Sequence, residues 1–385
     1  MTIGQAPLGA GVDRRAGAES AAVEVAPTPV GVAIAGLGTA LPSHRITTVD
    51  LAAALPRVWP GLERRMSTLL PQLEGCERHL ARPLDEMTTA LPLGEQTSRY
   101  LETALALAAS ASRQALSAAA VDPASVGCVV VTSCTGFILP GLDVRLIPVL
   151  GLRDDLVRLP FAQLGCAGGA AGLACAADWV RTHAGAAALV VAVELPSVTF
   201  RPGDTSLDNL LSAVVFGDGA AAALLTGAGE RALAPSEYPG SPVPTIGRTW
   251  SIVLPDSTAA LGYEMADDGY RVILSRSLPR QLEEALPTLA ARCLGERRAA
   301  DVDVVVAHPG GPAILEAVQR GLGLRDEQLA ASWAALRRTG NTSSAAVLFV
   351  LEKLRHAGLG AGATGLLLAF GPGLAVELLE LEWRG

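Results

Sequence analysis

Three side chains that lie far apart in the sequence have the types and settings of reactive groups, and Cys166 is the first. It lies in Leu164-Gly-Cys-Ala-Gly-Gly-Ala-Ala-Gly-Leu, where a glycine permits a tight turn and a helix of small residues should begin. A thiol at a helix N-terminus faces the positive end of the helix dipole, which lowers its pKa and favours the thiolate. The pattern indicates a nucleophile open to an acyl group; a buried structural cysteine is the alternative.

His308 and Asn341 are the other two side chains. His308 ends an expected buried strand in Val306-Ala-His-Pro-Gly-Gly-Pro, and side chains at the carboxyl ends of such strands reach the ligand crevice of α/β proteins. Asn341 opens an expected helix, where its amide N–H could stabilise an oxyanion beside His308. A core histidine bonded to the backbone and a simple N-cap asparagine are the alternatives.

The chain lacks the residues that several kinds of cofactor require. Its single lysine, Lys353, lies in a helical pattern and follows no phosphate-binding loop, which argues against Schiff-base enzymes and P-loop nucleotidases. The histidines show no metal-ligand spacing, and neither Gly36-Leu-Gly nor the glycines after Phe216 form a dinucleotide fingerprint. We therefore expect neither a metal nor an organic cofactor.

Composition limits the partners and the compartment. The 385 residues carry a net charge of −8, which argues against a nucleic-acid face. No apolar run reaches the roughly 18 residues of a membrane span, and no signal peptide is visible. Six scattered cysteines without a CxxC pair predict a reduced, cytoplasmic protein.

The elements that would position these residues alternate between strands and helices. Helices are expected at 47–75 and 95–120. Strands are expected at 30–35, 128–133, 189–194, 214–216, 302–308 and 365–370. Continuous apolar strands between helices predict an α/β fold with sheets buried on both faces. Residues 1–28 form a loose tail in this interpretation, and 228–262 a connection between two halves, 29–240 and 241–385.

The two halves repeat parts of their sequence. The ten residues from Phe216 match the ten from Phe370 at six positions. The strand at 129–131 matches 304–306 at an offset of 175 residues, and the same offset places Cys166 on Asn341. If the repeat reflects two related halves, a pseudo-twofold axis would bring both strand-to-helix turns towards one point.

Together these segments resemble the type III polyketide synthases, the chalcone and stilbene synthase family of the thiolase superfamily. The resemblance covers about residues 30 to 384. Its motifs are Thr132-Ser-Cys-Thr-Gly-Phe, Ala162-Gln-Leu-Gly-Cys-Ala-Gly-Gly, Phe216-Gly-Asp-Gly-Ala-Ala, His308-Pro-Gly-Gly-Pro, Gly340-Asn-Thr-Ser-Ser-Ala and Phe370-Gly-Pro-Gly-Leu-Ala-Val-Glu. It implies a homodimer with a thiolase-like duplicated five-layer αβαβα fold.

The resemblance also implies a reaction. Cys166 would take an acyl group from an acyl-CoA starter, while His308 and Asn341 would hold the thioester oxygen of malonyl-CoA during loss of CO2. The enolate would lengthen the acyl group over several rounds, and the chain would then cyclise. Two rival readings are a β-ketoacyl-ACP synthase of the fatty-acid-initiating type and a non-catalytic acyl-CoA-binding scaffold; a papain-like hydrolase is possible on residue types alone.

Further residues take roles from the same resemblance. Phe216 matches a gatekeeping phenylalanine, and Val272 stands where plant members carry a second aromatic gatekeeper. The remaining implied substrate contacts are Cys134, Thr199 and Ser343 in the cavity and Arg64 and Arg65 at the coenzyme A phosphates. Cys134 resembles enzymes that make small polyhydroxyaromatics, whereas 255–279 resembles alkylpyrone and alkylresorcinol synthases, so the sequence leaves the product open.

Overall fold

The computed structural model describes residues 31–62, 70–228, 241–266 and 269–385, and its central feature is a nine-stranded sheet. The strand order is β11-β12-β13-β8-β1-β7-β6-β4-β5. The strands are β1 (Val32–Ala40), β4 (Val126–Thr132), β5 (Val157–Phe161), β6 (Ala187–Glu194), β7 (Gly219–Gly227), β8 (Val243–Val253), β11 (Val304–Ala307), β12 (Thr364–Gly371) and β13 (Ala375–Arg384). The tail expected at 1–28 lies outside the described residues.

The sheet repeats one pattern in its two halves. In the first half β4 pairs parallel with β6, β6 antiparallel with β7, and β7 antiparallel with β1. In the second half β11, β12, β13 and β8 pair in the same order and with the same directions. The halves join where Val32 pairs with Ile246 and Ala33 with Thr245. This topology is the internal repeat that the sequence indicates.

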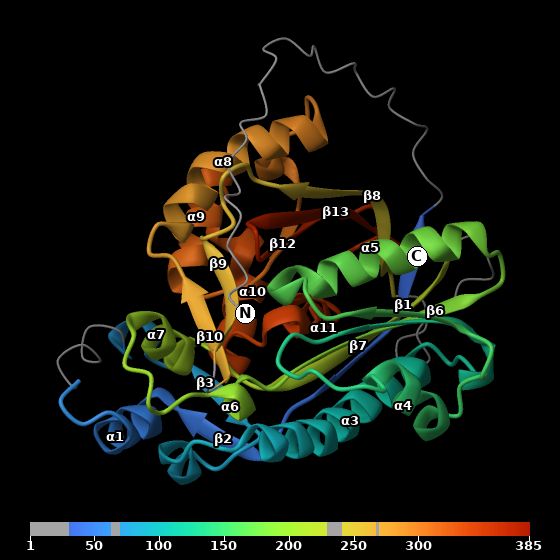
Figure 1. The fold of residues 1–385 in the computed structure, drawn as a ribbon. Helices are drawn as coiled ribbons and strands as arrows, with labels where there is room; N and C mark the ends of the chain where they lie inside the picture. Colours follow the sequence, from blue (N-terminus) through green and yellow to red (C-terminus); the bar gives the residue numbers. More distant parts are fainter. Residues whose placement is uncertain (1–30, 63–69, 229–240, 267–268) are drawn as a thin grey trace, which may run out of the picture.

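Helices complete the layers around the sheet (Figure 1). They are α1 (Thr48–Val58), α3 (Leu93–Ala118), α4 (Leu142–Leu150), α5 (Gly168–Thr182), α6 (Pro196–Thr199), α7 (Leu207–Val215), α8 (Leu278–Leu294), α9 (Pro312–Leu322), α10 (Asp326–Thr339) and α11 (Ala346–Leu354). Helices α5 and α11 lie between the two halves of the sheet, while α3 and α8 cover the outer sides. The fold is therefore the duplicated five-layer α/β arrangement of the sequence prediction.

Strand alternation explains why the strands are apolar throughout. In β4, Val129 and Val131 pack into the cluster beneath α3, whereas Cys128 and Val130 face the central cluster that contains α5 and α11. Successive side chains of a strand point to opposite faces, so a strand with helices on both sides needs apolar residues at every position. The buried apolar area of the middle layer thus holds α5 and α11 against each other.

Smaller elements gather at one end of the sheet. Two two-stranded antiparallel sheets, β2 (His44–Thr47) with β3 (Glu77–Leu80) and the hairpin β9 (Leu261–Ala266) with β10 (Gly269–Leu274), lie there with α1, α6 and α7 (Figure 1). An apolar cluster that includes Leu51, Trp59, Met87, Phe200 and Leu210 joins α1, α7 and the β2–β3 pair. Among the residues with described positions, no helix has both the length and the apolar character that a membrane span requires.

Three expectations about elements are wrong or only partly right. The strand expected at 214–216 is the end of helix α7, because Leu210 and Val214 bury one helical face and the Ser206 side chain accepts from Asn209 N at its start. Within the connection expected at 228–262, Val243–Val253 is a central strand that pairs with β13 and β1. The helix expected at 47–75 ends at Val58 in the described part.

Candidate active site

Cys166 lies where the sequence places it, between a strand and a helix of the first half. Strand β5 leads into the short 3-10 turn Gly165–Ala167, and α5 follows directly. Gly169 lets α5 approach the second half closely, since a Cβ there would lie 2.1 Å from the Ser344 carbonyl oxygen. The buried Cys166 Sγ consequently lies 3.4 Å from Ser343 Oγ.

Asn341 occupies the equivalent turn of the second half. Its backbone N donates to Val215 O (2.9 Å), and its carbonyl accepts from Gly217 N (3.0 Å), which forms a bridge to Phe216. Its Oδ1 accepts from Ser343 N at 2.8 Å, two residues on in the chain, as in an Asx turn. Nδ2 donates to Gly310 O at 3.4 Å, in the turn that follows His308, and its second hydrogen is the one that a substrate oxygen could accept.

His308 comes directly after β11 and is 3% exposed. Its backbone N donates to Leu368 O (2.8 Å), which fixes the residue at the carboxyl end of the parallel pair β11–β12. Within the described part of the chain, its enclosed Nδ1 has no hydrogen-bond partner. Asn341 links the site, because its side chain contacts the turn after His308 and lowers the pKa of Cys166 by hydrogen bonding.

Burial dominates the protonation of the thiol. It raises the pKa of Cys166 to about 12, and the nearby Glu194 charge adds to the rise, while the side chains of Ser343 and Asn341 lower it. The expectation of a lowered pKa is therefore wrong for the resting protein. Desolvation of a thiolate enclosed in apolar surroundings outweighs the helix dipole.

Burial also keeps the imidazole neutral. Desolvation lowers the pKa of His308 to about 4, so the ring is uncharged at neutral pH. An enclosed acceptor without a partner costs less than an enclosed N–H without one, which favours the tautomer with its proton on Nε2. A neutral ring in that tautomer offers one N–H to a substrate oxygen.

A buried carboxylate that the sequence analysis missed organises the surroundings of the sulfur. Glu194, at the end of β6, accepts from Cys134 N (3.1 Å), Thr135 Oγ1 (2.8 Å) and Ser344 Oγ (2.5 Å). Burial raises its pKa. It ties the loop after β4 to the 343–345 turn and so holds Cys134 Sγ at 3.7 Å from Ser343 Oγ. A charged residue closing the apolar run 189–193 was its sequence signal.

The other residues implied by the resemblance fall into two groups. Phe216, Thr199 and Val272 line one apolar cavity, together with Tyr263 and Tyr270. Ser343 lies beside the sulfur of Cys166, and Cys134 contacts the same Ser343 hydroxyl. Arg64 and Arg65 lie outside the described residues.

The two tyrosines had no signal in the sequence, because only the β9–β10 hairpin brings them to the cavity. No group of three His, Cys, Asp or Glu side chains suited to a metal ion occurs among the residues that the structure describes.

Comparisons with known proteins agree with this geometry. The model of the N-terminal domain of chalcone and stilbene synthases matches residues 84–229, and that of their C-terminal domain matches 247–382. A 1,3,6,8-tetrahydroxynaphthalene synthase of Streptomyces peucetius subsp. caesius is 36% identical over 361 residues, which cover 92% of this chain and 93% of the relative.

Two further comparisons extend the match. Phloroglucinol synthase of Pseudomonas fluorescens is 32% identical over 89% of this chain and 96% of its own. The crystal structure of 1,3,6,8-tetrahydroxynaphthalene synthase from Streptomyces coelicolor superposes with a TM-score of 0.83 at 29% identity, covering 91% of this chain and 98% of that one. Sequence and fold therefore match over nearly the whole length.

Proposed function

Because the chain belongs to the chalcone and stilbene synthase family and is a type III polyketide synthase, we propose that Cys166, His308 and Asn341 carry its reaction. The observation that supports these roles is the position of the Asn341 side chain, which contacts both the turn after His308 and the surroundings of the sulfur. The enzyme condenses an acyl-CoA starter with malonyl-CoA and repeats the extension before the chain cyclises.

Acyl transfer to Cys166 comes first. The sulfur attacks the thioester carbonyl, the bond between that carbonyl and coenzyme A breaks, and the proton of the thiol ends on the sulfur of free coenzyme A. Small residues around the turn leave room for the acyl carbonyl. The hydroxyl of Ser343 and the amide of Asn341 favour the anionic sulfur and so ease this step.

Decarboxylation of malonyl-CoA follows. The bond between the carboxylate and Cα breaks, CO2 leaves, and the electron pair forms an enolate on the thioester oxygen. Neutral N–H groups of His308 and Asn341 stabilise that charge without protonating the carbon, which keeps it nucleophilic. The carbon then attacks the acyl group and releases the Cys166 sulfur. The thioester supplies the activated carbonyl, so we propose that no metal or organic cofactor takes part.

Incubation with radiolabelled malonyl-CoA and a panel of acyl-CoA starters tests these roles. We expect CO2 release and an acyl adduct that maps to Cys166 by mass spectrometry. A protein that forms neither would be the non-catalytic scaffold of the alternative reading. Preference for acyl carrier protein over coenzyme A in a competition assay would instead favour a β-ketoacyl-ACP synthase.

We propose further that the enzyme is a homodimer. Large apolar side chains lie exposed around the loop after β4, among them Phe137 (68% exposed) and Leu139 (83%). Exposed apolar patches of this kind mark protein interfaces. Sedimentation should show a dimer that a Phe137→Glu, Leu139→Glu double variant converts to a monomer. Val49→Glu, at an exposed apolar residue of α1, is the control and should leave the dimer intact.

We also propose that the halves 29–240 and 241–385 are related units, as their matching strand order suggests. The six cysteines are unpaired, which supports a reducing compartment such as the cytoplasm.

A further inference from the structure

Arg78 is a buried charged residue that the proposed chemistry does not use. It lies on β3 and is 0% exposed. Among the residues that the structure describes, no hydrogen-bond partner reaches Nε, Nη1 or Nη2 of its guanidinium group. Burial lowers the pKa of Arg78 to about 10, so the group stays charged at neutral pH. A buried charge without a partner destabilises a fold, and its presence at this place therefore needs a reason.

The Arg78 side chain packs across the bridge between Phe216 and Asn341. A Cβ at Gly217 would lie 3.1 Å from Arg78 Cβ, and a Cβ at Gly340 would lie 3.3 Å from Arg78 Nε. Gly217 follows Phe216 in the chain, and Gly340 precedes Asn341. The stem of Arg78 thus lies beside one strand of the bridge and its Nε beside the other. Glycine at both places lets the side chain come this close.

The backbone of β3 is bonded to the same segment. His79 O, one residue after Arg78, accepts from Asp218 N at 2.8 Å. On its other edge β3 pairs with β2, where Arg78 stands opposite Ile46. Strand β3 cannot shift away from the bridge without breaking these bonds. The place of the Arg78 side chain is therefore fixed relative to the bridge.

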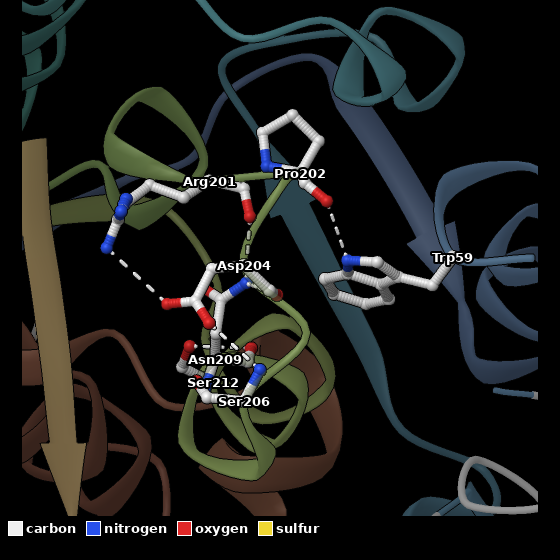
Figure 2. A network of polar contacts seen from close by, with 7 residues as sticks. All are labelled: Trp59, Arg201, Pro202, Asp204, Ser206, Asn209 and Ser212. Carbon is white, nitrogen blue, oxygen red and sulfur yellow. Dashed lines mark hydrogen bonds and ion pairs between the residues drawn. The ribbon is translucent and has the colours of Figure 1, made fainter. Parts of the chain in front are cut away.

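Helix α7 holds the other side of the bridge, and a polar network fixes the start of that helix (Figure 2). The Asn209 amide donates to the carbonyls of Arg201 and Asp204 at 2.9 and 2.8 Å. Phe216 directly follows the last residue of α7. Phe216 therefore enters the bridge from a fixed helix, and the place of its partner Asn341 depends on this helix and on the side chain from β3.

We propose that Arg78 is a positioning residue for decarboxylation, an inference that rests on the proposed function of Asn341. Its side chain fills the space beside Gly217 and Gly340 and so keeps the bridge in place. The Asn341 amide then stays in position to donate to the enolate oxygen. Packing rather than charge supports the bridge, because the guanidinium nitrogens have no partner in the described part of the chain.

Arg78→Leu tests the packing. Leucine keeps carbon atoms beside Gly217 but ends one atom short of the position of Nε, beside Gly340. Since a displacement of about 1 Å can slow a reaction roughly 10²-fold, we expect kcat for malonyl-CoA decarboxylation to fall about tenfold and KM to stay within about twofold. The midpoint of urea denaturation should not fall, because an apolar group replaces an unpaired buried charge.

Arg78→Met is the rescuing variant. Its terminal methyl group reaches the position that Nε occupies in the wild type, and it carries no charge. We therefore expect kcat to return to within about threefold of the wild type, as for other substitutions that conserve volume. A kcat as low as that of Arg78→Leu would show that packing against Gly340 is not the cause.

Arg82→Leu is the matched control. Arg82 is 1% exposed and lies four positions further along the chain, but its Nη2 donates to the carbonyls of Glu86 and Thr89 at 2.7 and 3.1 Å. We expect this variant to lower the urea midpoint, because buried acceptors lose their donor, and to leave kcat within about twofold of the wild type. The two leucine variants should thus have opposite effects on stability and on rate.

A double variant shows whether Arg78 acts through Asn341. The amide is gone in Asn341→Ala, so adding Arg78→Leu should lower the remaining decarboxylation rate by less than about twofold. A further tenfold loss would place the effect elsewhere and overturn the proposal. It would also be overturned by a wild-type kcat or a lowered urea midpoint in Arg78→Leu, or by an equal loss of kcat in Arg82→Leu.

These outcomes are distinct from a failure of the proposed function. In each of them the wild type still releases CO2 from malonyl-CoA and forms an acyl adduct on Cys166. A wild type that does neither refutes the proposed function itself.

Discussion

Phe216, at the end of α7, and Asn341, after α10, are paired by a parallel β-bridge, although 125 positions separate them in the sequence. Their parallel bridge uses Asn341 N to Val215 O (2.9 Å) and Gly217 N to Asn341 O (3.0 Å). Phe216, which lines the apolar cavity with Thr199 and Val272, and Asn341, the proposed oxyanion donor, therefore cannot move independently. A disturbance of the bridge should affect substrate entry and decarboxylation together.

Gly217 tests this coupling. A Cβ at this position would lie 2.2 Å from the Thr339 carbonyl oxygen, so Gly217→Ala must displace the bridge. We expect a loss of about 1–3 kcal/mol in the free energy of unfolding, measured by urea denaturation, and slower malonyl-CoA decarboxylation. Gly247→Ala on β8 is the control, because its nearest atom would lie 3.5 Å away, an ordinary contact. Equal, unperturbed behaviour of both variants would contradict the coupling.

Two substitutions at Asn341 separate its hydrogen bond from Ser343 N from its proposed chemical role. Asn341→Asp keeps an oxygen for Ser343 N but removes the amide donor, whereas Asn341→Ala removes both. We expect both variants to decarboxylate malonyl-CoA roughly 10²–10³ times more slowly, the usual effect of losing one oxyanion donor. Thermal unfolding should show Asn341→Asp to be the more stable of the two. A full decarboxylation rate in Asn341→Asp would mean that Asn341 serves only to hold the 343–345 turn.

The Ser343 hydroxyl should set the reactivity of the thiol. Its hydrogen bond lowers the pKa of Cys166 against the larger effect of burial, so Ser343→Ala should raise that pKa further. At pH 8 we expect iodoacetamide to inactivate the variant about fivefold more slowly, the equivalent of one ordinary hydrogen bond. Ser344→Ala removes a hydroxyl that bonds Glu194 instead. If that control slows alkylation as much as Ser343→Ala, the contact to the sulfur is not the cause.

The positions of Cys166 and Asn341 could be predicted because they follow from chain order. Each stands at a strand-to-helix turn of a repeated unit, and two related units in one sheet bring such turns together. Such turns can be located from local sequence, because buried strands and helices of small residues have regular, recognisable patterns. The fold class and the pair of turns were accessible from the sequence for this reason.

Glu194, Tyr263 and the pKa of Cys166 could not be predicted in the same way. The partners of Glu194 come from three separate segments, and Tyr263 reaches the cavity only through the β9–β10 hairpin. The pKa of Cys166 depends on how completely residues of the second half bury the thiol. The sequence shows that the thiol stands at a helix N-terminus, but it does not show how deeply the thiol is buried. Strand 214–216 was mistaken because β-branched valines suit a strand locally, whereas α7 buries them as a helix.

The pH dependence of decarboxylation tests the neutral imidazole. In Cys166→Ala the thiol no longer titrates, so His308 becomes the nearest titrating candidate in the proposed oxyanion site. Burial lowers its pKa from 6.5 to about 4, so the neutral ring persists above pH 5 and protonation sets in only as the pH falls towards 4. We therefore expect the rate of CO2 release from malonyl-CoA by this variant to stay constant between pH 5.5 and 9. The rate of His308→Gln should be lower but should likewise not depend on pH over this range. A transition in the Cys166→Ala rate with a midpoint near 6.5, absent from a Cys166→Ala, His308→Gln double variant, would show that the ring is solvated and that a charged imidazolium, rather than a neutral donor, acts on the enolate.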